Sequence, residues 1–298
     1  MELRGIFAPI TTPLSTAGEG LALEHLRQNF DVYNKTNLAG YVVCGSTGEA
    51  ILLTWDETDR LFAAVIEHAS RDKMLVAGTG TESTAETIVR TRRAAALGYH
   101  VALVRTPHYY KPFMTHTALL NYYRAVADAS PIPVLIYSIP QFTGVDVPGE
   151  LIARLAEHPN ICGIKDSWGK LSVVQEIIAA APKRFQTLVG AATILEPSLR
   201  LGAVGAILGV ACVAPVLCAE LYAAAVTGES ARADELQKKL APISVKCVSE
   251  SGPAGVKFAM DCLGMYGGPV RRPLLPLTQE QQMSIRSVLS IVQPVPAR

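Results

Sequence analysis

Residues 74–107 read MLVAGTGTESTAETIVRTRRAAALGYHVALVRTP, and this stretch decides the fold. Two short apolar runs, which end near Gly78 and Val104, flank a longer amphipathic stretch. Ser83 and Glu86 open that longer stretch with the spacing of a helix capping box. The segment therefore predicts a strand, a helix and a second strand, and short valine-rich runs of this kind suit parallel strands buried on both faces.

The same alternation runs through most of the chain. Predicted strands end near Pro9, Val43, Gly78, Val104, Tyr137, Lys165, Val189 and Leu208. Predicted helices cover residues 21–35, 54–71, 84–97, 115–129, 148–157, 171–181, 194–201 and 216–227. Eight successive βα units are the number found in a (β/α)₈ barrel. The sequence therefore predicts an α/β fold, a TIM barrel, as the catalytic domain over residues 1–227.

The alternation stops after residue 227. Residues 229–240, 254–263 and 279–291 are expected to form helices without strands between them, so residues 228–298 are predicted to be a C-terminal helical region. An open doubly wound sheet is the alternative architecture. That fold normally carries a glycine-rich βα turn for a nucleotide, and no convincing turn of this kind is present.

Composition excludes several classes of protein. The formal net charge is +1, which gives no electrostatic case for nucleic acid or an anionic membrane as partner. Hydrophobic residues make up 49% of the chain and charged residues 18%, which is typical of a well-buried globular enzyme. The N-terminus lacks the apolar core of a signal peptide, and the longest apolar run, 203–219, is interrupted by glycine and proline. We therefore expect a cytoplasmic location.

No cofactor is expected from the motifs present. The six histidines are scattered and do not have the spacing of a metal site. The six cysteines form no CxxC pair and are expected to be buried, reduced side chains. The sequence contains no phosphate-binding loop with a basic partner, which argues against pyridoxal phosphate. We therefore expect neither a metal ion nor another cofactor.

Lys165 is the principal catalytic candidate. Barrel enzymes build their active sites at the carboxyl ends of the strands, and Lys165 closes an apolar strand there. Loss of solvent in a crowded barrel mouth favours the neutral amine, which can attack a ketone and form an iminium ion. A structural lysine paired with Asp166 or Glu49 is the alternative, and position alone leaves both interpretations open.

Other polar side chains are expected at the same rim. Tyr137 closes the neighbouring strand, where a phenol can relay protons. Ser46 and Thr47 lie between two glycines after the second strand, in a loop that can hold a carboxylate through several hydrogen bonds or can be an ordinary turn. Tyr109 and Tyr110 follow the fourth strand, and packing aromatics are the alternative interpretation for both.

These stretches together resemble the dihydrodipicolinate synthase / N-acetylneuraminate lyase family of class I aldolases. The resemblance covers essentially the whole chain. It rests on residues 5–13 (GIFAPITTP), 45–49 (GSTGE), 107–109 (PHY), 137–140 (YSIP) and 163–166 (GIKD).

The resemblance implies roles for individual residues. Lys165 would form the Schiff base with pyruvate or a larger 2-oxo acid, and Tyr137 would relay protons and contact the substrate carboxylate. Ser46 and Thr47 would bind that carboxylate, with Thr47 also linking the tyrosines. Tyr109 would complete the relay across a subunit interface, which implies a homotetramer built as a dimer of dimers. The small-molecule partners would be pyruvate and an aldehyde.

Three further residues are candidates for substrate binding, namely Ser167, Gly190 and Phe142, and some of these positions distinguish the branches of the family. Ser167 and Gly190 follow the sixth and seventh strands. Synthases that use aspartate semialdehyde carry an arginine where this chain has Phe142, and a phenyl ring cannot make the bidentate hydrogen bonds of a guanidinium. Sialic-acid lyases keep polar residues after the seventh strand, whereas residues 190–194 are mostly apolar. Phe142 and Trp168 are expected to make the outer pocket apolar.

The chain looks most like the 4-hydroxy-2-oxoglutarate aldolases of this family, which release pyruvate and glyoxylate. The shared segments are residues 137–140, 143–144, 158–161, 165–167, 201–205 and 265–269. Dihydrodipicolinate synthase activity is the alternative reaction. Dehydration or hydratase-aldolase chemistry on the same iminium, and a non-catalytic sensor that binds 2-oxo acids, are the remaining hypotheses.

Overall fold

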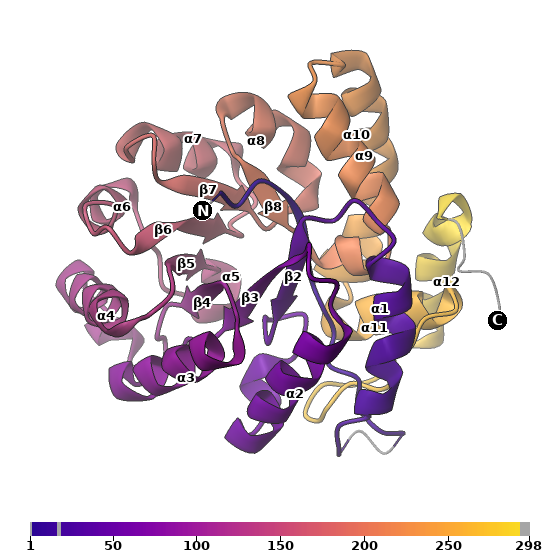
Figure 1. Cartoon of the computed structure of the whole chain (residues 1–298). Coiled ribbons are helices and arrows are strands. Elements are labelled where there is room, and N and C mark those ends of the chain that lie inside the picture. The colour runs from indigo at the N-terminus through magenta and orange to yellow at the C-terminus, as the bar shows by residue number, and fades with distance from the viewer. Residues whose placement is uncertain (1, 17–18, 293–298) are drawn as a thin grey trace. The chain divides into compact units, whose positions relative to one another are not determined.

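The computed structural model describes residues 2–16 and 19–292. Within these residues, eight parallel strands are hydrogen-bonded in chain order and close into a barrel with helices between them (Figure 1). The strands are β1 (Gly5–Pro9), β2 (Gly40–Val43), β3 (Met74–Gly78), β4 (Val101–Arg105), β5 (Val134–Ser138), β6 (Ile161–Asp166), β7 (Gln186–Val189) and β8 (Gly205–Ile207). The predicted TIM barrel with a C-terminal helical extension is confirmed.

Twelve α-helices accompany the strands in the described part of the chain. They are α1 (Leu26–Tyr33), α2 (Trp55–His68), α3 (Thr84–Leu97), α4 (His116–Ala129), α5 (Pro140–Thr143), α6 (Gly149–Leu155), α7 (Leu171–Ala180), α8 (Leu195–Leu201), α9 (Pro215–Val226), α10 (Ser230–Ser244), α11 (Gly252–Cys262) and α12 (Gln279–Val288). The other helical turns, of the 3₁₀ type except for the π-helical η6, are η1 (Leu23–His25), η2 (Ala50–Leu52), η3 (Lys111–Phe113), η4 (Ala192–Ile194), η5 (Gly209–Cys212), η6 (Val245–Ser249) and η7 (Leu289–Ile291).

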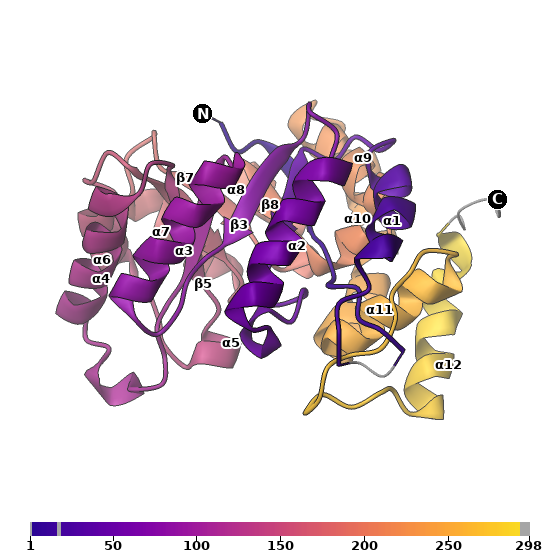
Figure 2. The same ribbon diagram turned by 60° about the horizontal axis from the view of Figure 1, so that its bottom comes forward.

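The chain divides into two compact units, and each is described by itself. The first comprises the segment up to Gly5 and Leu75–Ile207; the second comprises Ile6–Met74 and the chain from Leu208 onward. In the first unit, α3, α4, α6, α7 and α8 contact one another in succession (Figure 1). In the second, α9 packs on α10, and α11 packs on α12 (Figure 2). A domain boundary between residues 227 and 228 stays a prediction.

Local sequence signals explain several of the helix ends. Thr54 and Glu57 form a complete capping box at the start of α2: the Thr54 hydroxyl accepts the Glu57 amide proton at 3.2 Å, and the Glu57 carboxylate accepts that of Thr54 at 2.9 Å. The Ser83 hydroxyl caps α3 through the Glu86 amide. Gly98 ends α3 with φ of +99°, a conformation that glycine adopts without strain.

One predicted helix end is too early. The helix expected to stop at Leu240 continues through Pro242 to Ser244 and then forms the π-helical turn η6. Leu240 and Ile243 are completely buried. Their packing offsets the hydrogen bond that the proline cannot make.

One apolar cluster holds β6, which carries the candidate lysine, together with β4 and β5. Val104, Ile136 and Ile164, from β4, β5 and β6, are fully buried against side chains such as Tyr123 of α4 and Ile152 of α6. Burying a side chain of this size stabilises the fold by about 1.5–3 kcal/mol. The carboxyl ends of these strands are therefore held by rigid packing.

Candidate active site

Lys165 and Tyr137 lie side by side on adjacent strands. The register of β5 and β6 pairs Tyr137 directly with Lys165. Both side chains are buried, each with 4% of its surface exposed, and the Lys165 Nζ atom lies 3.9 Å from the centre of the Tyr137 ring. The two residues predicted to form the imine and to relay protons are therefore brought together.

Gly190 gives Lys165 and Ser167 the space they occupy. A Cβ atom at position 190 would overlap the Ser167 hydroxyl and would lie 3.2 Å from Cε of Lys165. The Gly190 amide also donates to the Asp166 carbonyl at 2.6 Å, which joins the ends of β6 and β7. Lys165, Tyr137, Ser167 and Gly190 thus form one group in the first unit, in which Lys165 and Tyr137 are buried and Ser167 and Gly190 are partly exposed.

The alternative interpretation, that Lys165 is a structural lysine paired with Asp166 or Glu49, does not agree with its contacts. Glu49, one of its two suggested partners, forms an ion pair with Lys257 within the second unit, with Nζ and Oε1 2.5 Å apart. Among the described residues of its own unit, Lys165 forms no ion pair, with Asp166 or with any other acid. The Lys165 amine lies over the Tyr137 ring, and no carboxylate in the described part of this unit pairs with it.

Asp166 is a buried carboxylate beside the candidate nucleophile. Its Oδ2 atom accepts the Trp168 amide proton at 3.2 Å, and its Oδ1 atom has no hydrogen-bond partner among the described residues. Burial raises the pKa of Asp166 to about 7. The folded chain therefore retains a proton on Asp166 over a pH range in which an unfolded chain has already released it.

This raised pKa gives a pH-dependent prediction for Asp166→Asn. The protonated Asp166 contributes stability to the natural chain at pH 4. This contribution is lost as the pH rises towards 7, because in this range the unfolded chain binds fewer protons than the folded chain. The asparagine variant cannot ionise and escapes that loss. In urea unfolding it is expected to gain roughly 1–3 kcal/mol over the natural chain at pH 8 and about a quarter of that gain at pH 4.5.

Asp56→Asn is the control for this prediction, since the Asp56 side chain is 79% exposed. It is expected to show no comparable difference between the two pH values. An equal gain for Asp166→Asn at pH 4.5 and pH 8 would contradict the assignment of a raised pKa to Asp166.

Ser46 and Thr47 lie in the second unit, in a tight turn that follows β2. The Gly48 and Glu49 amides donate to the Gly45 and Ser46 carbonyls at 3.1 and 3.0 Å. The Thr12 hydroxyl, in the segment after β1, donates to the Gly48 carbonyl at 2.6 Å and helps to fix the turn. The two predicted carboxylate-binding hydroxyls are therefore carried by a constrained backbone.

Two features tighten this turn further. Cys44 and Glu49 flank it with φ values of +57° and +56°, which is unusual for residues other than glycine and is typical of functional loops. Gly209 lies against the turn, where a Cβ atom would come 3.4 Å from the Thr47 hydroxyl and 3.0 Å from Val248. A Cβ atom at 209 would therefore press on Val248 and only touch the Thr47 hydroxyl.

Tyr109 and Phe142 belong to the first unit but are exposed, with 76% and 69% of their surfaces accessible. The Tyr109 ring contacts the edge of Tyr110, with centroids 5.1 Å apart. Phe142 lies in α5, next to Gln141, whose side-chain amide donates to the Ser167 carbonyl at 2.6 Å and the Trp168 carbonyl at 3.0 Å. Gln141 therefore ties α5 to the segment that follows Lys165.

Sequence reasoning missed α5 and Gln141, and it also missed the carboxylate of Glu82, which contacts the Tyr109 backbone. The proline at position 140, which is favourable in the first turn of a helix, was a signal for α5. Nothing in the local sequence of Glu82 indicates its partners, because these follow the next strand.

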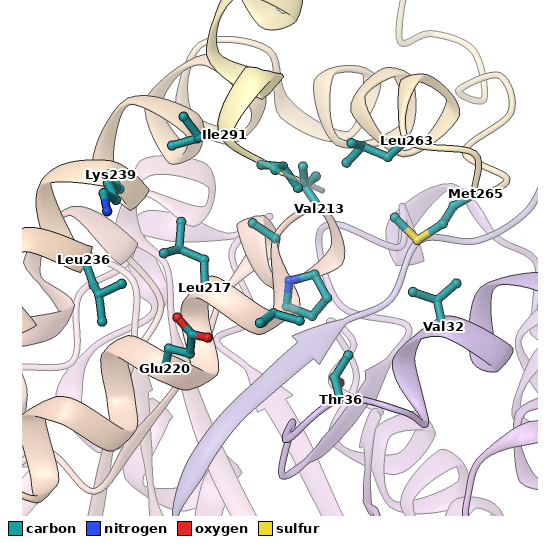
Figure 3. A pocket seen from close by; sticks show the side chains of 14 residues that line it. Val32, Thr36, Val213, Leu217, Glu220, Leu236, Lys239, Leu263, Met265 and Ile291 are labelled. Carbon is teal, nitrogen blue, oxygen red and sulfur yellow. The ribbon is translucent and has the colours of Figure 1, made fainter. Parts of the chain in front are cut away.

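A cavity of about 420 Å³ with a mixed polar and apolar lining lies in the second unit (Figure 3). Its lining includes Val32, Leu217 and Met265, with Glu220 and Lys239 as charged members. None of the residues that line it is a candidate site residue. The cavity therefore contributes no residue to the candidate site.

Two further findings concern the described residues 2–16 and 19–292. No three histidine, cysteine, aspartate or glutamate side chains among them come together in a way that could hold a metal ion. Their helices are all too short or too polar to cross a membrane.

Comparison with known proteins agrees with this geometry. Residues 2–292 match the model of the dihydrodipicolinate synthetase family. The 4-hydroxy-tetrahydrodipicolinate synthase of Methanothrix thermoacetophila is 39% identical over 288 residues, which are 96% of each chain. The 4-hydroxy-tetrahydrodipicolinate synthase of Thermomicrobium roseum is 36% identical over 288 residues, which are 97% of this chain and 94% of the relative.

A solved structure is similar over the same length. It is the chloride-inhibited dihydrodipicolinate synthase of Acinetobacter baumannii, complexed with pyruvate. It superposes with a TM-score of 0.92 at 32% identity and covers 97% of this chain and 98% of its own.

Proposed function

The chain belongs to the dihydrodipicolinate synthetase family, and from this premise we propose that Lys165 forms a Schiff base with pyruvate. The family consists of pyruvate-dependent class I aldolase-type enzymes that make or break a carbon–carbon bond. The observation that carries the proposal is the buried Lys165 amine, which is paired in register with Tyr137 and forms no ion pair in its described unit.

The proposed chemistry begins with addition of the Lys165 amine to the keto carbon of pyruvate. Loss of water from the adduct gives an iminium ion, and loss of a proton from the methyl group gives an enamine. The enamine carbon then attacks the aldehyde carbon, whose oxygen takes up a proton. Tyr137 moves these protons, with Thr47 and Tyr109 as further members of the relay, and Ser46 and Thr47 bind the pyruvate carboxylate.

We place condensation of pyruvate with aspartate semialdehyde first among the reactions. The relatives named above are called synthases, so they favour this alternative over the 4-hydroxy-2-oxoglutarate aldolase that the sequence led us to expect. That aldolase remains the second candidate because of one observation: Phe142 is an exposed phenyl ring at the position where an arginine is expected in synthases.

A substrate panel separates these reactions. Purified enzyme is given pyruvate with aspartate semialdehyde, and separately 4-hydroxy-2-oxoglutarate, and pyruvate is measured with lactate dehydrogenase and NADH. The proposal expects pyruvate consumption that depends on aspartate semialdehyde. A kcat/KM at least ten times higher for 4-hydroxy-2-oxoglutarate cleavage would favour the second candidate. Pyruvate binding without turnover of any 2-oxo acid would indicate the sensor.

Phe142→Arg provides a prediction about the aldehyde. If aspartate semialdehyde is the partner, a guanidinium at this position adds a charge-assisted hydrogen bond to its carboxylate, worth about 1.5–3 kcal/mol. The variant is expected to raise kcat/KM for the semialdehyde roughly 10- to 100-fold while KM for pyruvate stays unchanged. Leu275→Arg, at an exposed leucine (77% accessible) outside the Tyr109 segment, is the control. Equal rates for both variants would contradict the placement of Phe142 beside the aldehyde.

We also propose a cytoplasmic homotetramer. Tyr109, Tyr110 and Phe113 are all more than half exposed on one short segment of the first unit. Grouped aromatic surface of this kind favours burial against another chain. Light scattering coupled to gel filtration tests the assembly, and a monomer at micromolar concentration would contradict it.

A further inference from the structure

Glu82 forms a clamp on the backbone of the segment that carries Tyr109. Its Oε2 atom accepts the amide protons of His108 at 2.7 Å and of Tyr109 at 2.9 Å. Its Oε1 atom lies 2.8 Å from Nη1 of Arg105, the last residue of β4. One carboxylate therefore joins the β3–α3 connection, the end of β4 and the Tyr109 segment.

The charges in this group hold the carboxylate ionised. Although partial burial opposes it, the hydrogen bonds from Tyr109, Arg105 and His108 keep the pKa of Glu82 below its ordinary value. His108 adds a further contact, since its Nδ1 atom lies 2.8 Å from Glu82 Oε1 and 2.9 Å from Arg105 Nη1. An ionised carboxylate that accepts backbone amide protons makes stronger hydrogen bonds than a neutral group does.

The segment beyond the clamp is exposed. Tyr109, Tyr110 and Phe113 present most of their surface to solvent, and Lys111 and Pro112 are exposed as well. Apolar burial therefore contributes little to fixing the Tyr109 backbone in the single chain. The register pairs Arg105 with Tyr137, so the clamp is attached to the strand next to the one that bears the proposed proton relay.

We infer that Glu82 is a positioning residue, which fixes the Tyr109 backbone so that the Tyr109 phenol can serve the proton relay. The inference rests on the proposed function, because it requires Tyr109 to take part in proton transfer. It predicts that Glu82 affects kcat and not pyruvate binding, since the carboxylate acts only through Tyr109.

The first test compares two variants of Glu82. Glu82→Ala removes both backbone contacts and is expected to lower kcat roughly 10- to 100-fold, the order of loss caused by misplacing a catalytic group. KM for pyruvate is expected to change less than threefold. Glu82→Gln keeps one oxygen for the two amide protons, so it is expected to recover at least a third of the natural kcat. Glu86→Ala is the matched control: Glu86 is a nearby carboxylate of α3 whose partner is Arg90, and its loss is expected to leave kcat unchanged.

The second test is a double-mutant cycle with Tyr109→Phe. If Glu82 acts through Tyr109, the double variant loses no more activity than Tyr109→Phe alone. Losses that multiply would overturn the inference, as would an unchanged kcat in folded Glu82→Ala or Tyr109→Phe. If the natural enzyme itself neither consumes nor releases pyruvate, the proposed function fails instead. Borohydride trapping of pyruvate on Lys165 that persists in Glu82→Ala shows that only the positioning has changed.

Discussion

Lys165→Arg is expected to lower turnover with pyruvate by roughly 10⁴-fold or more, the order of loss seen when a covalent nucleophile is removed. Arginine is similar to lysine in length, but its guanidinium stays protonated and cannot form an imine. The buried site beside Tyr137 accepts a long side chain, so the variant is expected to fold. Steady-state assays with the preferred aldehyde measure the loss.

Lys170→Arg is the matched control for that experiment. The Lys170 Nζ atom lies 3.9 Å from the ring of Trp168, the same distance that separates Lys165 from the Tyr137 ring. Arginine also stacks on aromatic rings, so this control is expected to keep its activity within twofold. Turnover by Lys165→Arg within tenfold of the natural enzyme would rule out a Schiff base at Lys165.

Lys257→Met is expected to destabilise the chain by about 3–5 kcal/mol, the cost of leaving one member of a buried ion pair without its partner. Lys257 is 1% exposed, and its ammonium contacts Glu49 Oε1 at 2.5 Å and the Pro269 carbonyl at 2.7 Å. Burial lowers the pKa of Lys257, and the charge of Glu49 opposes that effect. Equilibrium urea unfolding monitored by circular dichroism measures the change.

The same variant is expected to disturb the turn that carries Thr47. Glu49 ends that turn, and its second oxygen accepts the Arg271 amide proton at 2.7 Å. The Arg271 guanidinium in turn holds Glu57 at 2.6 and 2.7 Å. An unpaired Glu49 would reorganise these contacts, so KM for pyruvate is expected to rise even where the protein remains folded.

Lys246→Met is the control for the buried pair. Lys246 pairs with Glu250 four residues later on an exposed helical turn, and such pairs contribute at most about 0.5 kcal/mol. A double variant, Lys257→Met with Glu49→Leu, is expected to recover part of the loss, because it leaves no buried charge unpaired. A loss below 1 kcal/mol for Lys257→Met would contradict the importance of the pair.

The fold was largely predictable because its signals are local. The capping residues Thr54 and Ser83 mark helix starts that the structure contains, and α3 has the predicted bounds. The strands with Tyr137 and Lys165 end one residue later than predicted, which leaves both side chains near the carboxyl ends. The predicted end of α10 is too early because Pro242 is a local signal for the end of a helix. The packing that allows the helix to continue is tertiary and cannot be read from the local sequence.

The candidate site was predictable only in part, because the partner of a charged side chain depends on the whole fold. The sequence left Lys165 with Glu49 as a possible partner, whereas Glu49 pairs with Lys257, which is far away along the chain. The sequence around Glu82 gave no indication of its contacts, since its partners are backbone amides that follow another strand, β4. The roles of all the candidate site residues stay predictions, and the variants described above test those of Lys165, Tyr109 and Phe142; the others are Tyr137, Ser46, Thr47, Ser167 and Gly190.

The central claim is that Lys165 carries an imine, and borohydride reduction in the presence of pyruvate tests it most directly. Intact mass spectrometry is expected to show one reduced pyruvyl adduct per chain, and peptide mapping should locate it on Lys165. The adduct should be absent from Lys165→Arg and present in Lys170→Arg. A folded protein that gives no adduct, or that gives one on another lysine such as Lys257, would contradict the account.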